Sequence, residues 1–535
     1  MAAAVIKSLS IISLLVSSCQ ASFHTRRDVN TTFENPVFPG WHADPSCVFV
    51  PEEGNTTFCV TSSFLNFPGL PIYASKDLQS WEHVINVLNR GEQLPGHASV
   101  NGNPRGGVWA PTIRYREGKF YVIVTYVTYN PRETARNYLF EADDPFNDAS
   151  WSIPHTITNP GGGNHIDPDL FWDNGTAYMA TGWGRIYLSV IDIETGNASQ
   201  KVEIWKGAGG NNPEGPHFYK KDGYFYLLIA EGGAGINHAA TIARSKDIYG
   251  PYESYEGNPV LTNRGSNELF QSVGHADLFP DANGNWWAVA LTTRSGPDMK
   301  NYPMGRETAL TAVTWDADSW PVFDPVRGTM KGPLPKSSER LGKGPLIDSA
   351  DELDFEPGSS LPRHLVHFRS KVEDTYTVSE NNSLRLRPSQ SNLTGPIDGF
   401  NSADGVTFIG RRQTATLFEF SADLSFDPTD VGEEAGITVF LSQQQHIDLS
   451  VVKLQESESP QLRMTATTFG RPTAPVPETV LESIPQDWAE CPIRLAVKAN
   501  DPDNYEFLAS SPCGAGNITM GTASSDATSG GFIGM

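Results

Sequence analysis

The sequence predicts an all-β protein, a five-bladed β-propeller followed by a β-sandwich. Three observations lead to this prediction: a hairpin pattern that recurs five times, a composition rich in Gly (49), Pro (39) and aromatic residues, and a change of pattern past about residue 335. Short strands joined by frequent turns suit such a composition better than a helical bundle does. The 535 residues are enough for two or three domains.

The recurring pattern is a β-hairpin. Each copy begins with a small or turn-forming step, continues as a short alternating strand, turns at acidic, Asn or Gly residues, and returns through aromatic residues. The copies open at Asp44, Ala110, Asp167, Glu214 and His275, at intervals of 66, 57, 47 and 61 residues. Repeats of this length are typical of propeller blades. The alternative, an irregular sandwich, would require five coincidental matches to one pattern.

The chain divides into four segments. Residues 1–21 are predicted to be a signal peptide, because Lys7 precedes a short apolar stretch and small residues follow at a cleavage position. Residues 30–335 form the predicted propeller, and residues 336–350 a linker. Residues 351–535 contain further alternating stretches without the repeat, and they form the predicted sandwich.

Charge and cysteine usage agree with export. The formal net charge of −23 argues against a nucleic acid or an anionic membrane as partner, because both would repel the protein. No later segment is long and apolar enough to span a bilayer. The cysteines predict two disulfides, Cys47–Cys59 and Cys491–Cys513. Seven N-x-S/T triplets are compatible with glycosylation, at Asn30, Asn55, Asn174, Asn197, Asn381, Asn392 and Asn517. We therefore expect a secreted, extracellular protein.

Three carboxylates should meet in this fold. In a propeller the first strand of each blade lies along the central axis, so equivalent residues of different blades converge. Asp44, Asp167 and Glu214 stand at such positions. Glycoside cleavage needs one protonated and one ionised carboxyl group, and a third acid nearby raises the pKa of the proton donor. Each acid alone could equally start a turn; their shared repeat position favours catalysis.

Four further residues are candidates for substrate binding. His275 could hold a sugar hydroxyl, orient a carboxylate or bind a cation, although a lone His at a strand start is more often structural. Arg294 could donate hydrogen bonds to a sugar, with a surface salt bridge as the alternative. Trp109 and Phe64 could stack on a sugar face, and burial in the core is the alternative for both.

Several stretches resemble glycoside hydrolase family 43: "NPVFPGWHADPSCVF", "GGVWAPTIRYREGKFYVIVTY", "HIDPDLFWDNGTAYM", "PEGPHFYKKDGYFYLLIAEGG", "VGHADLFPDANGNWWAVAL" and "GRETAL". The resemblance implies that Asp44 is the general base, Glu214 the general acid and Asp167 the pKa modulator, with net inversion. It also implies a concanavalin A-like sandwich. No cofactor is required, and a structural calcium near His275 is left open, as is the presence of the sandwich's last strand.

The branch that the sequence most resembles contains β-xylosidases and α-L-arabinofuranosidases. It implies release of terminal α-L-arabinofuranose or β-D-xylose from arabinoxylan or xylo-oligosaccharides, so a plant cell-wall polysaccharide or oligosaccharide is the expected partner. An endo-arabinanase of the same fold is one alternative, and a non-catalytic carbohydrate-binding propeller is another. Retention of all three acids argues against the second, because a binding module needs no proton donor.

Overall fold

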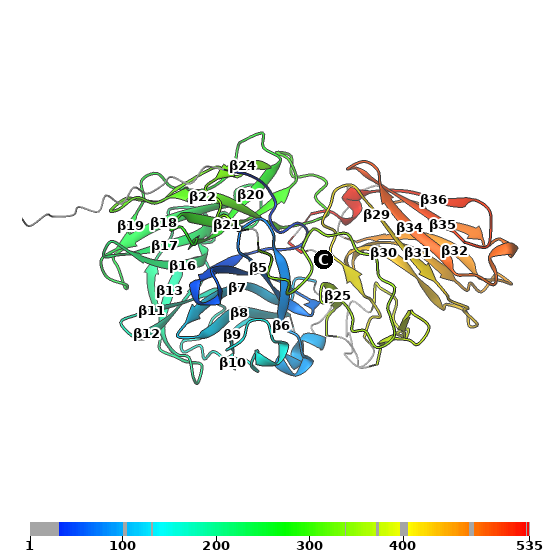
Figure 1. Ribbon diagram of the computed structural model, residues 1–535, viewed down its shortest axis with the longest axis horizontal. Helices are drawn as coiled ribbons and strands as arrows, with labels where there is room; N and C mark the ends of the chain where they lie inside the picture. The colour runs from blue at the N-terminus through cyan, green and yellow to red at the C-terminus, as the bar shows by residue number, and fades with distance from the viewer. Residues whose placement is uncertain are drawn as a thin grey trace, which may run out of the picture.

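The computed structural model describes residues 31–99, 104–129, 132–337, 339–370, 374–395, 405–469, 476–530 and 532–533. The predicted signal peptide, residues 1–21, lies outside this range. Within the described ranges no helix is long and apolar enough to cross a membrane. Two all-β domains lie side by side, with a propeller built from the N-terminal part of the chain and a sandwich built from the C-terminal part (Figure 1).

Five antiparallel sheets form the propeller, and each corresponds to one predicted repeat. The first two blades are β2 (Ser46–Val50), β3 (Thr56–Val60), β5 (Gly69–Ser75) and β6 (Glu82–Leu88), then β7 (Gly107–Arg116), β8 (Lys119–Tyr129), β9 (Glu133–Ala142) and β10 (His155–Thr156). The third contains β11 (Ile166–Asp173), β12 (Thr176–Gly182), β13 (Ile186–Asp192), β14 (Asn197–Ala198) and β15 (Val202–Trp205). The last two are β16 (Glu214–Lys221), β17 (Tyr224–Glu231), β18 (Ala239–Ser245) and β19 (Glu253–Ser254), then β20 (Phe270–Pro280), β21 (Trp286–Arg294), β22 (Glu307–Thr314) and β23 (Val322–Phe323).

The two ends of the propeller are joined by strand pairing. Strand β1 (Thr31–Glu34) pairs antiparallel with β24 (Thr329–Gly332), which follows the fifth blade. Phe38 also bridges Thr308 of β22. These hydrogen bonds connect residues almost 300 positions apart, so the chain segment before the first blade anchors the last one.

A left-handed residue marks the start of the inner strand in every blade. These five residues are Asp44, Ala110, Asp167, Gly215 and His275, with φ of 52°, 44°, 56°, 56° and 45°. In four blades the next residue is proline. The equivalent position in the fourth blade is therefore Gly215, not Glu214 as the repeat alignment placed it. Glu214 instead matches Trp109 of the second blade, one residue earlier.

The conformation explains which residues stand at this position. A left-handed backbone costs a non-glycine residue roughly 1–2 kcal/mol, and Asp tolerates it better than most. Strained residues of this kind concentrate at functional sites. A Cβ atom on Gly215 would also lie 2.9 Å from the ring of His275. Both the left-handed backbone and this close contact therefore require glycine at this position.

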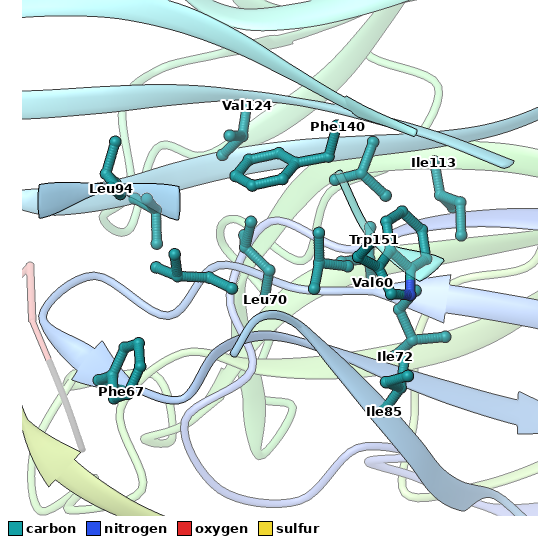
Figure 2. Close-up of a cluster of buried hydrophobic side chains, with 14 of the residues drawn as sticks. Val60, Phe67, Leu70, Ile72, Ile85, Leu94, Ile113, Val124, Phe140 and Trp151 are labelled. Carbon is teal, nitrogen blue, oxygen red and sulfur yellow. The ribbon is translucent and has the colours of Figure 1, made fainter. Parts of the chain in front are cut away.

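The largest buried cluster of apolar side chains lies between the first two blades and continues into the second domain. Its propeller members include Val60, Ile72, Ile113 and Phe140 (Figure 2), and Phe368 extends it past the propeller. Strand β25 (Leu365–Phe368) pairs with β4 (Asn66–Phe67) of the propeller. This shared core and strand pairing hold the two domains together.

The second domain is a sandwich of two four-stranded sheets. One sheet contains β29 (Phe418–Leu424), β34 (Ile493–Ala499), β35 (Asn504–Ser510) and β36 (Asn517–Ser524). The other contains β30 (Glu434–Ser442), β31 (Gln445–Val452), β32 (Gln461–Thr468) and β33 (Val480–Ser483). The predicted linker is not a free tether, because the Glu82 carboxylate of β6 accepts backbone N–H groups of Gly342, Lys343 and Gly344.

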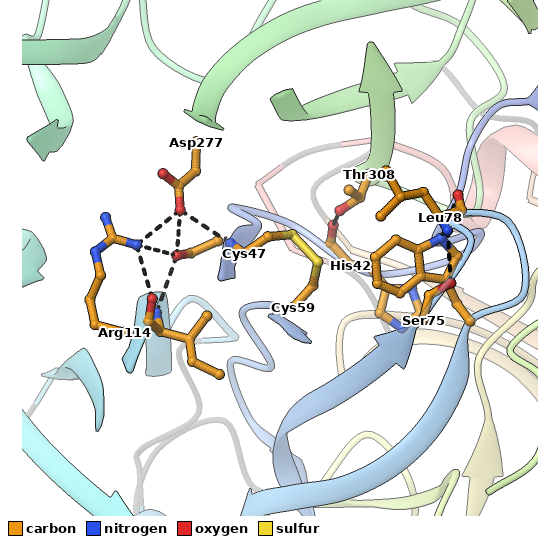
Figure 3. Close-up of a disulfide and its surroundings, with 11 residues drawn as sticks. His42, Cys47, Cys59, Ser75, Leu78, Arg114, Asp277 and Thr308 are labelled. Atoms are coloured by element: carbon orange, nitrogen blue, oxygen red, sulfur yellow. Dashed lines mark hydrogen bonds and ion pairs between the residues drawn. A yellow bond between two sulfur atoms is a disulfide. The ribbon is translucent and has the colours of Figure 1, made fainter. Parts of the chain in front are cut away.

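Both predicted disulfides are present. Cys47 and Cys59 stand directly opposite each other on β2 and β3, with their Cα atoms 4.1 Å apart. The bridge lies next to the polar network that Arg114 and Asp277 form on the propeller axis (Figure 3). It therefore ties together the hairpin that follows Asp44. The second bridge, Cys491–Cys513, joins two segments of the sandwich.

Candidate active site

Asp44 is buried and held by three neighbours. Its Oδ2 accepts the Ser62 hydroxyl at 2.7 Å, and its Oδ1 accepts Nη1 of Arg306 at 3.1 Å. Nδ1 of His275 lies 3.6 Å from the same Oδ1. Burial by itself raises the pKa of Asp44, but Arg306, His275 and Ser62 together hold that pKa below its usual value. Asp44 is therefore ionised near neutral pH, as a general base must be.

Asp167 and Glu214 experience the opposite electrostatic environment. Burial, followed by the charges of Glu214 and Asp44, raises the pKa of Asp167 well above its usual value. Burial and the charge of Asp44 raise the pKa of Glu214 to about 7. Like charges in a poorly solvated site oppose each other's ionisation, so the pair retains a proton near neutral pH. The Gly215 N–H donates to Oδ2 of Asp167 at 3.1 Å and favours the anion there. The pair therefore holds one proton, and its assignment to Glu214 is the prediction that a substitution at Asp167 tests.

Replacing Asp167 by asparagine tests this assignment. The substitution removes a negative charge beside Glu214, so the pKa of Glu214 should fall and the alkaline limb of the pH–rate profile should move from about pH 7 to lower pH. The measurement is kcat/KM against pH. Asp173→Asn, at the far end of the same strand, is the matched control and should leave the limb in place. An unmoved limb in the Asp167 variant would mean that Asp167 itself carries the proton.

Arg306 connects the carboxylates to the second domain. Besides Asp44, it donates from Nη2 to the backbone oxygen of Phe532 at 2.8 Å. Its guanidinium carbon lies 5.0 Å from the ring centroid of Trp41 and 4.6 Å from that of Phe532. Such cation–π contacts strengthen when they are desolvated, and Arg306 is 3% exposed. A segment more than 200 residues away thus contacts the residue that fixes Asp44.

Phe64, Trp109 and Phe532 form an aromatic cluster beside these groups. Phe64 and Trp109 stack with ring centroids 5.5 Å apart. Phe532 meets both edge-on, at 5.4 and 5.1 Å. Phe64 is 2% exposed and Trp109 7% exposed. The structure thus brings Trp109 and Phe64 to the site, and it adds an aromatic ring from the sandwich domain.

The two remaining sequence candidates lie in different surroundings. His275 packs against Gly215 and faces Asp44, and burial lowers its pKa to about 4, so its imidazole is neutral. Arg294 is placed elsewhere. It pairs with Glu307 at 2.6 and 2.8 Å and donates to the backbone oxygen of Thr414 at 3.0 Å. The arginine that contacts Asp44 is Arg306, so the predicted substrate contact of Arg294 has no support in this geometry.

A polar network fills the axis below the carboxylates, with contributions from all five inner strands. Arg114 donates to Asp169 at 2.6 Å and to Asp277 at 3.2 Å. Ser46 and the Tyr219 hydroxyl each donate to Asp277 at 2.6 Å. Both aspartates are fully buried and paired with a guanidinium, which is the arrangement a buried charge requires. The network fixes the relative positions of the blades that carry the site.

The structurally described residues form no cluster of acidic side chains around His275 that would by itself hold a calcium ion. Ca²⁺ takes roughly six to eight oxygen ligands, chiefly carboxylates and carbonyls. In the part of the chain that the structure describes, no group of three or more His, Cys, Asp or Glu side chains could hold a metal. Asp44, the carboxylate 3.6 Å from His275, pairs with Arg306. Two further carboxylates on the propeller axis, Asp169 and Asp277, pair with Arg114.

Sequence reasoning missed four residues. Arg306 lies within "GRETAL", one of the stretches that carry the family resemblance, and Phe532 lies near the end of the sequence; neither was singled out. Glu231 is buried and accepts the N–H groups of Ala208 and Gly210, which fixes the loop leading into Glu214. Trp183 is 47% exposed. It follows Gly182, where a Cβ atom would lie only 2.6 Å from Cα of Glu214. An exposed tryptophan is a candidate platform for a sugar ring.

Family models match both domains. The model described as glycosyl hydrolases family 43 matches residues 33–321. The model described as the β-xylosidase C-terminal concanavalin A-like domain matches residues 352–535. The two matches correspond to the propeller and the sandwich, and they confirm the predicted fold class.

Individual relatives agree with the models. The chain is 36% identical over 442 residues to a non-reducing end α-L-arabinofuranosidase of Bacteroides ovatus, covering 81% of this chain and 78% of the relative. It is 35% identical over 445 residues to a xylosidase/arabinosidase of Butyrivibrio fibrisolvens, covering 79% and 80%. The solved structure of a xylan β-1,4-xylosidase from Bacillus halodurans superposes with a TM-score of 0.79 at 28% identity, covering 93% of each chain.

Proposed function

Because the chain belongs to glycosyl hydrolase family 43, we propose that this glycosidase removes terminal α-L-arabinofuranose or β-D-xylose from arabinoxylan or xylo-oligosaccharides. The observation that carries the proposal is the division of charge among three converging carboxyl groups. The pKa of Asp44 is lowered, whereas burial and neighbouring charges raise the pKa of Asp167 and that of Glu214, the latter to about 7. One ionised and one protonated carboxyl group are what glycoside hydrolysis requires.

The proposed mechanism assigns one task to each acid. Glu214 delivers its proton to the leaving oxygen while Asp44 takes a proton from the attacking water, so the anomeric configuration inverts. Arg306 and Ser62 keep Asp44 ionised and oriented through hydrogen bonds of 3.1 and 2.7 Å. The role proposed for Asp167 is to oppose ionisation of Glu214 through like charge, in addition to the burial and the Asp44 charge that raise the pKa of Glu214.

The position of Phe532 supports an exo-acting enzyme. This residue of the second domain packs on Phe64 and Trp109 and accepts a hydrogen bond from Arg306. It therefore bounds the propeller mouth on one side of the carboxylates. An endo-arabinanase needs a groove open at both ends, so a mouth bounded in this way favours removal of a terminal sugar.

A secreted location and a cell-wall substrate are part of the proposal. Two disulfides suit an oxidising compartment. The sequon asparagines that the structure describes, Asn55, Asn174, Asn197, Asn381, Asn392 and Asn517, are all exposed and could carry glycans. A net charge of −23 disfavours a polyanion such as a nucleic acid, which leaves a polysaccharide as a compatible partner.

Side-by-side hydrolysis tests the proposed function. Nitrophenyl α-L-arabinofuranoside and β-D-xylopyranoside are compared first, and products from xylo-oligosaccharides and debranched arabinan are then separated by size. We expect nitrophenol release from at least one glycoside, and monosaccharide as the early product. Oligosaccharides appearing first from arabinan would indicate the endo-acting alternative. A folded protein without activity on any of these substrates would contradict the proposal.

A further inference from the structure

A cavity of about 400 Å³ lies between the second and third blades, apart from the three carboxyl groups. Its floor is formed by buried side chains of β9, β12 and β13, among them Asn137, Thr181 and Ser189. The segment from Thr156 to His165, which leads into β11, forms one wall. The volume falls within the range of about 300–1,000 Å³ typical of small-molecule sites.

The charge of the lining is unusual for this protein. The chain carries a net charge of −23, yet no Asp or Glu is among the residues that line the cavity. Arg136 and Lys201 line it instead, together with the imidazole of His165. Lys201 Nζ contacts both the His165 ring and the backbone oxygen of Gly162, which positions the ammonium group at the wall. Two cations without a lining acid favour an anionic ligand.

The polar floor indicates what accompanies the negative charge. The hydroxyl groups of Thr181 and Ser189 and the amide of Asn137 can donate to and accept from the hydroxyls of a sugar. No Phe, Tyr or Trp is among the lining residues, so the cavity offers no stacking platform for a neutral sugar face. A ligand that carries both a carboxylate and several hydroxyl groups matches this combination.

The cavity is connected to the site by hydrogen bonds. The backbone N–H of Asp167 donates to Oγ1 of Thr125 at 2.9 Å, and this hydroxyl donates to Oδ1 of Asn137 at 3.0 Å. His165, in the cavity wall, stands two residues before Asp167. Asn164 also accepts the N–H of Ala135, another lining residue. A ligand in the cavity would therefore be linked to the backbone of Asp167 through Asn137 and Thr125.

From these observations we propose that the cavity is a binding subsite for an acidic sugar, a uronic acid residue whose carboxylate pairs with Arg136 and Lys201. The inference rests on the proposed function, which places a sugar chain at the propeller mouth, so that an acidic residue of that chain could occupy the cavity. It gives the enzyme a second point of attachment to acidic substrates beside the mouth that accepts the terminal pentose.

Calorimetric titration of the full-length protein with methyl glucuronide tests the proposal. We expect saturable binding that methyl glucoside does not reproduce and that arabinose and xylose do not displace. Lys201→Ala or Arg136→Ala should weaken it by about tenfold to a hundredfold, the loss expected for one charge-assisted hydrogen bond. Arg185→Ala removes one positive charge from the same blade, where Arg185 pairs with Glu203 outside the cavity lining, and should leave binding unchanged.

Three results would overturn the inference. They are no binding to the unmodified protein, displacement by xylose or arabinose, and binding of inorganic sulfate as tight as that of the glucuronide. The last would make the cavity a site for small anions. Hydrolysis of neutral nitrophenyl glycosides, measured on the same preparation, separates the two proposals. An active protein that fails to bind the glucuronide contradicts the subsite alone, whereas a protein that binds it without activity contradicts the proposed function.

Discussion

Replacing Glu214 by glutamine is expected to lower kcat/KM on natural xylosides and arabinosides by about 10² to 10⁴. The amide keeps the shape of the side chain but cannot deliver the proton that the carboxyl group holds because burial and Asp44 raise its pKa to about 7. The loss should be much smaller on aryl glycosides with acidic leaving groups, which depart without full protonation. Steady-state kinetics on both substrate classes measure the difference.

The comparison has an internal control. Glu203→Gln makes the same chemical change at an exposed residue of β15 that pairs with Arg185, and it should leave both rates unchanged. An equal loss on natural and activated substrates in the Glu214 variant would contradict the role of general acid. It would indicate that the substitution disturbs binding or folding instead.

Replacing Asp44 by asparagine should cost about 10² to 10⁴ as well, but to the same extent on both substrate classes. Attack by water is required whatever the leaving group, and asparagine cannot accept the proton. The acid limb of the pH–rate profile, which follows the lowered pKa of Asp44, should also disappear. Because the variant leaves Arg306 without its carboxylate, thermal unfolding is measured in parallel.

Two outcomes would contradict the assignment of Asp44. A loss confined to natural substrates would make Asp44 a proton donor. An unchanged acid limb in a folded variant with reduced rate would mean that a different group limits the reaction at low pH. Glu203→Gln again serves as the control for loss of one surface carboxylate.

The propeller could be predicted because its repeat is local. A short strand, a turn and an aromatic return strand recur in each blade, with a proline after the first turn-forming residue in four of the five, and these follow from turn and strand chemistry. The repeat pattern also predicted correctly that Asp44, Asp167 and His275 occupy equivalent positions in their blades. It misplaced Glu214 by one residue, because only the left-handed φ of Gly215 reveals which of two adjacent residues makes the turn.

Long-range pairing could not be predicted in the same way. Arg294 ends β21 and Arg306 directly precedes β22 in the fifth blade, and sequence alone does not tell which of them faces Asp44. In the structure Arg294 pairs with Glu307, and Arg306 is the arginine that pairs with Asp44. Phe532 belongs to the second domain and lies more than 200 residues after Arg306 in sequence, and no periodic pattern predicts such a contact.

The central claim is that Asp44 activates water and does not attack the sugar. The most direct measurement is proton NMR of the sugar released in the first minutes of hydrolysis, before mutarotation. We expect the inverted anomer, so that a β-D-xyloside gives α-D-xylose and an α-L-arabinofuranoside gives the β-anomer. A first product with the configuration of the substrate would contradict this claim, since it would make Asp44 a nucleophile that forms a covalent glycosyl intermediate.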